Sequence, residues 1–171
     1  RVPKTTVVPE KRPIVVGFGP AGMFAALVLA LAGLKPIVLE RGADAVTRHA
    51  KVQEFWKTGK LDEKTNVQFG EGGAGTFSDG KLNTGTKDIR HRFILEHLVA
   101  CGAPEDILID AKPHVGTDYL HIALKNMRQE LLDAFEAENG ESILPALPAM
   151  IGKCKPTYHQ GELIANWFDL C

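Results

Sequence analysis

The stretch that decides the fold begins Ile14-Val-Val-Gly-Phe-Gly-Pro-Ala-Gly22 and ends Pro36-Ile-Val-Leu-Glu40. The short apolar run from Ile14 to Gly17 is typical of a strand that is buried on both faces. Pro20 to Ala32 is rich in Ala and Leu and predicts a helix that is apolar nearly all round, stopped at Gly33. Strand, helix and second strand follow one another within about 27 residues, which predicts a βαβ unit. We therefore expect an α/β fold with a parallel sheet.

Three glycines at the first turn have the spacing Gly17-x-Gly19-x-x-Gly22, the fingerprint of a dinucleotide-binding turn. Gly17 would allow the tight turn out of the strand, Gly19 would let backbone N–H groups approach a pyrophosphate, and Gly22 would let helix and strand pack closely. The first helical turn would add unpaired N–H donors and the positive end of the helix dipole. The alternative is a glycine turn with a structural role alone.

An acidic residue, Glu40, ends the second predicted strand. It follows Gly17 at a spacing close to the roughly 20 residues at which an acidic side chain reaches an adenosine ribose. A carboxylate at this place accepts hydrogen bonds from two ribose hydroxyls and disfavours a 2′-phosphate. The alternatives are a solvated strand-end carboxylate for Glu40 and an ordinary surface charge for Arg41.

The remainder of the chain predicts three more helices and one glycine-rich segment. The helices are expected over Ala43–Lys57, Asp88–Ala100, and from Thr117 or Asp118 to Asn139-Gly140. The last carries an apolar stripe formed by Leu120, Leu124, Met127 and Leu131. Six of the 17 glycines fall between Gly70 and Gly85. Asp110 follows Ile107-Leu-Ile109 and is a possible strand end. Residues 1–12 are interpreted as a leader or linker, residues 13–140 as the domain, and residues 141–171 as an unassigned tail.

Composition limits the classes of function. The net charge of −1 and the absence of a Lys/Arg block argue against a nucleic-acid partner and a polybasic membrane patch. The longest apolar run, Met23 to Leu34, is shorter than the roughly 20 residues of a membrane span. Three cysteines without C-x-x-C spacing predict reduced thiols in a cytoplasmic protein. The histidines share no metal-ligand spacing, so no metal site is expected; His114 is expected to be a loop residue bonded to backbone.

At this level of detail the residues resemble a known family. Gly17-Phe-Gly-Pro-Ala-Gly-Met-Phe-Ala-Ala26 with Ile37-Val-Leu-Glu-Arg-Gly42 is similar to the first βαβ of the flavoproteins that have two dinucleotide-binding domains. Within that superfamily, Phe69-Gly-Glu-Gly-Gly-Ala-Gly-Thr-Phe-Ser-Asp-Gly-Lys-Leu-Asn-Thr84 and Ala111-Lys-Pro-His-Val-Gly-Thr-Asp118 resemble a group called FAD-dependent dehydrogenases. The resemblance covers roughly residues 10 to 135.

The resemblance implies a Rossmann-like FAD/NAD(P)-binding domain and an oxidoreductase that transfers hydride through flavin N5. Members are much longer, so it also implies that the FAD-binding domain at 13–140 is incomplete. The implied cofactor is FAD, with the ribose on Glu40, Arg41 beside it, and Arg48 as a possible phosphate partner or a solvated helix residue. The implied pyrophosphate residues are Gly17, Gly19, Pro20, Ala21 and Gly22. The residues implied beside the flavin ring are Gly72, Gly73, Ala74, Gly75 and Thr76, with Ser78 and Asp79 nearby.

Two other functions are compatible with the sequence. One is an NAD-dependent dehydrogenase domain, against which the glycine-rich segment at 70–85 argues; NAD(P) is also a possible co-substrate of the flavin enzyme. The other is a truncated, catalytically inactive nucleotide-binding fragment, supported by the unassigned tail. The sequence predicts a small-molecule substrate without identifying it, and it names neither a catalytic acid or base nor an oligomeric state.

Overall fold

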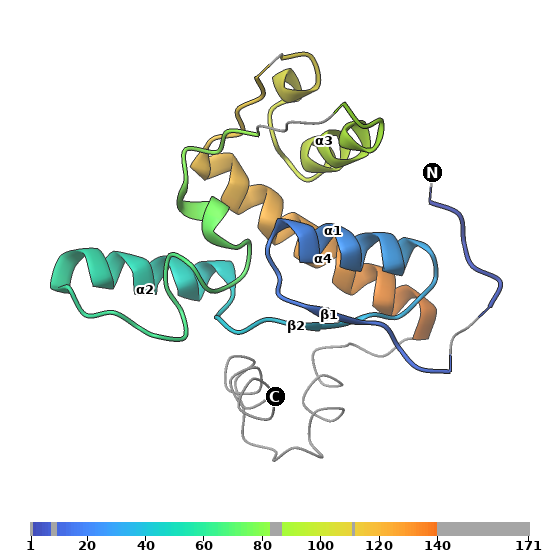
Figure 1. Ribbon diagram of the computed structural model, residues 1–171, viewed down its shortest axis with the longest axis horizontal. Helices are drawn as coiled ribbons and strands as arrows, with labels where there is room; N and C mark the ends of the chain where they lie inside the picture. The colour runs from blue at the N-terminus through green and yellow to red at the C-terminus, as the bar shows by residue number, and fades with distance from the viewer. Residues whose placement is uncertain (1, 8–9, 83–86, 111, 140–171) are drawn as a thin grey trace.

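The computed structural model describes residues 2–7, 10–82, 87–110 and 112–139 of the 171-residue chain. Over these residues the fold is mixed α/β, with a two-stranded parallel sheet and four α-helices (Figure 1). The order is β1 (Ile14–Val16), α1 (Pro20–Leu31), β2 (Ile37–Leu39), α2 (Ala45–Thr58), η1 (Ala74–Phe77), α3 (Arg90–Ala100), η2 (Glu105–Leu108) and α4 (Thr117–Asn139), where η denotes a short 3-10 helix.

The predicted βαβ unit is confirmed. β1 and β2 pair in parallel, with Ile14 opposite Ile37 and Val16 opposite Leu39. The pairing extends one step further, because Gly17 N donates to Leu39 O at 2.7 Å. This register brings the two turns that follow the strands to the same edge of the sheet.

The prediction that β1 is buried on both faces is wrong. Val15 is buried, whereas the side chains on either side of it, Ile14 and Val16, are 62% and 46% exposed. Among the described elements, α1 packs against this sheet on one face only (Figure 1). The expectation that α1 is buried all round is also wrong, because the helix buries a single stripe formed by Met23, Ala26 and Leu27.

The core lies between α1 and α4, which run side by side (Figure 1). The predicted stripe on α4 is confirmed: Leu124, Met127 and Leu131 are buried and Leu120 packs against them. Cys101, which follows α3, is a buried free thiol of the same core. Burial, together with the neighbouring Glu130 carboxylate, raises the pKa of Cys101 to about 11.

The predicted helices at 43–57 and 88–100 correspond to α2 and α3, whose ends lie within two residues of the prediction. The predicted strand end at Asp110 is wrong, because residues 105–108 form the 3-10 turn η2. Ile107 is buried there and Ile109 is 84% exposed, so the apolar residues serve to anchor a turn.

The structure describes most of the predicted leader at residues 1–12 and none of the predicted tail. Thr5 N donates to Ala32 O at 2.9 Å, and Arg12 Nε donates to Lys35 O at 2.6 Å, so the leader contacts the βαβ unit. The predicted tail at 141–171 lies outside the described residues, as do residues 83–86 of the glycine-rich segment. No helix within the described part is both long and apolar enough to cross a membrane.

Candidate functional site

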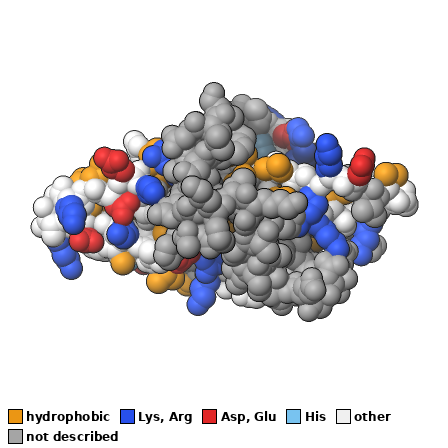
Figure 2. All heavy atoms as spheres, turned by 90° about the horizontal axis from the view of Figure 1, so that it is seen from below, with side chains coloured by type: hydrophobic (Ala, Val, Ile, Leu, Met, Phe, Trp, Pro, Cys, Tyr) orange, Lys and Arg blue, Asp and Glu red, His pale blue; other side chains and the backbone are white. Residues whose placement is uncertain are grey.

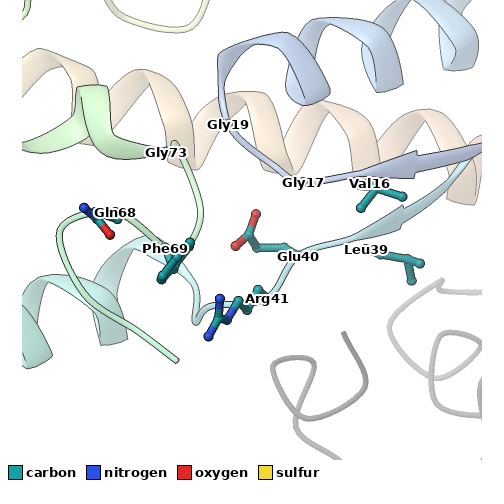
Figure 3. Close-up of a pocket in the computed structure, with 10 residues that line it drawn as sticks. Val16, Gly17, Gly19, Leu39, Glu40, Arg41, Gln68, Phe69 and Gly73 are labelled. Carbon is teal, nitrogen blue, oxygen red and sulfur yellow. The ribbon is translucent and has the colours of Figure 1, made fainter. Parts of the chain in front are cut away.

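A pocket of about 380 Å³ opens where β1 and β2 end. Five residues predicted for the cofactor line it: Gly17, Gly19, Glu40, Arg41 and Gly73. Figure 3 shows the Glu40 side chain extending from the end of β2 toward the two glycine-rich segments. The lining residues that the sequence did not single out are Val16, Leu39, Gln68, Phe69 and Gly70.

The first wall of the pocket is the glycine turn. Gly17 has a φ of +89°, the left-handed region that favours glycine. A Cβ on Gly22 would overlap the carbonyl oxygen of Gly17, so α1 approaches the turn too closely for any side chain there. Gly19 is different, because its φ is −78° and an added Cβ would lie 3.6 Å from Gly73 Cα, an ordinary contact.

The N-terminus of α1 begins at this turn and carries no side-chain cap. Met23 N donates the first α-helical bond, to Gly19 O at 2.9 Å, so the amides of Ala21 and Gly22 precede it. The first turn contains no acidic residue. The positive end of the helix dipole is therefore not neutralised by a side chain of its own turn.

Glu40 joins the two turns that follow the strands. Its Oε2 accepts from Phe18 N at 2.6 Å and its Oε1 accepts from Gly42 N at 2.9 Å. The solvated strand-end alternative is thus not what the structure shows. A carboxylate has about four acceptor positions, so these bonds leave about two for another donor.

Arg41 and Phe69 form one side of the pocket. The Arg41 guanidinium lies over the Phe69 ring, 4.1 Å from the ring centroid, and its Nη2 donates to Glu63 O at 3.4 Å. Arg41 is half-buried, in contrast to the free surface charge considered as the alternative.

The second glycine-rich segment closes the pocket from the other side. Gly72 N donates to Phe18 O at 2.8 Å, and an added Cβ on Gly73 would lie 3.2 Å from Gly19 Cα. Two predicted cofactor segments, about 50 residues apart in the chain, are therefore in direct contact.

The residues of this second segment have different exposures. Gly72 and Thr76 are buried, Ala74, Gly75, Ser78 and Asp79 are exposed, and Gly73 lies at the pocket. The Thr76 hydroxyl oxygen is buried and, within the described residues, has no hydrogen-bond partner.

The prediction that Arg48 is a solvated helix residue is wrong, because its side chain is fully buried. Arg48 is not among the residues that line the pocket, and its role as a phosphate partner stays a prediction. The guanidinium donates to backbone carbonyls of residues 66–71 and lies over the Phe77 ring, 4.8 Å from the centroid.

Glu71 is the second buried charge that the sequence did not reveal. Its Oε2 accepts from Ala45 N at 2.6 Å and pairs with Arg128 Nη1 at 3.1 Å, while Oε1 has no partner among the described atoms. Burial raises the pKa of Glu71, against the amide of Ala45 and the Arg128 charge, which lower it. A lone acidic residue inside Gly70-Glu-Gly-Gly73 was the available signal.

The prediction for His114 is confirmed. Its Nε2 contacts the carbonyl oxygen of Asp79, and Lys81 pairs with His114 in an antiparallel bridge. Val115 N donates to Gly80 O at 2.9 Å, which ties the third resembling segment to the second. Over the part of the chain that the structure describes, no three His, Cys, Asp or Glu side chains are grouped to hold a metal ion.

No family model matches the sequence. The chain is similar to an uncharacterized protein of Clostridium beijerinckii, with 50% identity over 155 residues that cover 91% of this chain and 29% of that protein. The chain therefore spans less than a third of the length of the curated relative it matches.

Proposed function

We propose that this chain is the FAD-binding portion of a flavin-dependent oxidoreductase and that its α/β fold is a Rossmann-like FAD/NAD(P)-binding domain. One observation carries the proposal: the uncapped N-terminus of α1, the Glu40 carboxylate and the second glycine-rich segment meet at one pocket. An anion is favoured at such a helix terminus, and ribose hydroxyls are suitable donors to such a carboxylate.

The glycines supply a test of fit to a dinucleotide. Among the glycines in the described residues, all but Gly19 and Gly75 either have a positive φ or would bring an added Cβ into a contact shorter than 3.4 Å. The protein itself therefore does not require glycine at these two positions. A ligand that approaches the backbone would require it, which fits a pyrophosphate at Gly19 and a flat ring near Gly75.

Each part of the site would have its own task. The amides at the start of α1 would bind the pyrophosphate, and Arg41 would add positive charge at the pocket. Glu40 would orient the ribose with its remaining acceptor positions. The backbone of residues 72–76 would position the flavin ring, and a bound flavin would supply hydride transfer at N5.

The experiment compares ADP with FAD. Purified protein is titrated with ADP, FAD and NAD by calorimetry, and bound nucleotide is released by denaturation and identified. Gly19→Ala should weaken ADP and FAD binding alike, by about tenfold or more, which is about 1.4 kcal/mol. Gly75→Ala should weaken FAD binding and leave ADP binding unchanged, because ADP lacks the flavin half.

Each outcome has a defined meaning. FAD and ADP binding with the two-variant pattern supports the proposal. A colourless protein that binds neither ligand would overturn it, and tight NAD binding without FAD binding would replace it with an NAD-dependent domain. Both alanine variants should fold, because neither Cβ meets a close contact, and Gly19→Ala should lose less than about 1 kcal/mol as an N-cap of α1.

The activity of the whole protein is part of the same proposal, because the chain covers 29% of its longer relative. We propose a small-molecule substrate, possible use of NAD(P) as co-substrate, and a cytoplasmic location, which the free thiol of Cys101 fits. We also propose that nucleic acid is not a partner, on the ground of the net charge of −1. Figure 2 shows basic and acidic side chains together on the described part of one face.

A further inference from the structure

Residues 66–71 are folded around one buried side chain, the guanidinium of Arg48. Its Nε donates to Asn66 O at 2.9 Å, its Nη2 to Val67 O at 2.8 Å, and its Nη1 to Glu71 O at 2.6 Å and Gly70 O at 3.3 Å. The guanidinium of Arg48 therefore binds carbonyl oxygens at both ends of the loop formed by residues 66–71. A guanidinium has five N–H donors in one plane, a geometry that an ammonium group cannot reproduce.

This loop is also the wall of the pocket that faces Glu40. Gln68, Phe69 and Gly70 line the pocket, and the carbonyls of the residues on either side of Gln68-Phe69 are bound by Arg48. Gly70 packs directly on the Arg48 stem, since an added Cβ would lie 2.5 Å from Arg48 Cδ. The position of the wall is therefore set by a side chain of α2 that does not itself line the pocket.

Two neighbouring carboxylates favour the charged form of the buried Arg48 guanidinium. Burial lowers the pKa of Arg48, while the carboxylates of Glu40 and Glu71 oppose that shift. The Phe77 ring covers one face of the guanidinium, with its centroid 4.8 Å from Arg48 Cζ. Removing the side chain would take this partner from the carbonyls of Asn66, Val67 and Glu71, whereas Gly70 O would keep its bond from Gly73 N. An unsatisfied buried polar group is costly.

We propose that Arg48 is a positioning residue for nucleotide binding: its planar fork holds residues 66–71 as the pocket wall opposite Glu40. The inference rests on the proposed nucleotide site. It states that the affinity for nucleotide depends on Arg48 although this side chain does not touch the ligand. It requires the shape of the guanidinium, since positive charge alone can satisfy fewer of the four carbonyls.

The test uses the full chain and three variants. Arg48→Lys keeps the charge and loses the fork. Arg92→Lys is the matched control, because Arg92 is exposed on α3 and bonds Glu96 and Leu108 away from the pocket. Asn66→Ala loosens the same loop without altering Arg48, because Asn66 Oδ1 accepts from Gln68 N at 2.8 Å.

Two readouts are measured: affinity for ADP, and hydrogen exchange at the amides of Glu71 and Gly72, which donate to Ala43 O and Phe18 O. Arg48→Lys should lower ADP affinity about tenfold or more and accelerate exchange at these two amides, with the amides of α1 and α4 unchanged. Asn66→Ala should act in the same direction with a smaller loss, and Arg92→Lys should match the wild type.

Several results would overturn the inference. Unchanged ADP affinity in a folded Arg48→Lys variant does so, and so does accelerated exchange without a loss of affinity. If Arg48→Lys fails to fold, Asn66→Ala decides, and wild-type affinity there is a negative result. A wild-type chain that binds no ADP overturns the nucleotide site itself, and amide exchange then still decides whether Arg48 orders the wall.

Discussion

The two glycine-rich segments that meet at the pocket are held in place by different means. The turn at Gly17–Gly22 is fixed by its neighbours in sequence: strand pairing, a helix start and one close approach between Gly22 and Gly17. The segment at residues 66–76 contains little regular structure and is held by side chains from α2 and α4. One half of the site follows from local rules, and the other depends on a few buried charges.

The largest effect is expected at Gly22, which fixes the first segment. Gly22→Ala places a methyl group against the Gly17 carbonyl, and overpacking by so short a contact should cost about 3 kcal/mol, the upper end of the usual range. Urea unfolding measures the loss. Gly75→Ala is the control, since nothing lies within 4 Å of its added Cβ, and its stability should remain within about 0.5 kcal/mol of the wild type. Equal midpoints for the two variants would contradict the close approach.

The second segment should respond to pH through Glu71. Its pKa is raised on folding, chiefly by burial, so its contribution to stability is present at low pH and is lost as pH rises above the ordinary value of 4.5. The difference in unfolding free energy, Glu71→Gln minus wild type, should therefore increase with pH, by up to about 1.4 kcal/mol per pH unit. Urea unfolding from pH 4 to 7 gives this difference; a flat or falling curve refutes it.

The N-terminus of α2 supports the second segment, because this helix carries Arg48. Asp44 Oδ1 accepts from Val46 N at 3.0 Å and from Thr47 N at 3.2 Å, so it caps the helix. Asp44→Ala should lower stability by about 1 kcal/mol. Asp44→Asn, which retains an acceptor oxygen, should recover most of the loss in thermal unfolding. A loss as large in the Asn variant would mean that charge, and not the cap, is responsible.

The smallest effect is expected where the turn after β2 meets the second segment, through Arg41 and Phe69. A cation–π contact at a partly exposed site contributes about 0.5 to 1 kcal/mol. A double-mutant cycle with Arg41→Gln and Phe69→Leu, followed by urea unfolding, should give a coupling energy in that range. Additive single-variant losses would show that the two side chains are neighbours without an interaction.

The βαβ unit and the stripe on α4 could be predicted from the sequence because each depends on residues a few positions apart. Pro20 and Gly33 bound α1 through backbone preferences, and the spacing of Leu124, Met127 and Leu131 states which side of α4 is buried. The first half of the candidate site follows from the same local rules.

The burial of Arg48 could not be predicted, because it depends on carbonyls 18 to 23 residues away that lie in a loop without periodicity. The exposure of Ile14 and Val16 was missed for a related reason. A continuous apolar run indicates that other elements can pack on both faces of a strand. Which face is actually buried depends on where the helices lie. Ile107 shows the same limit, since one buried side chain can anchor a turn as well as a strand.

The buried thiol of Cys101 can be used to detect opening of the core, because a reagent reaches it only when the core opens. Burial raises the pKa of Cys101 to about 11, so at pH 7 the folded chain holds this group as the unreactive thiol. Alkylation of Cys101 should then require opening of the α1–α4 core, and its rate should follow core opening once the reagent is concentrated enough to outpace reclosing, provided that Cys154 and Cys171 are replaced by serine. Labelling kinetics followed with and without ADP would show whether the pocket and the core open together or separately.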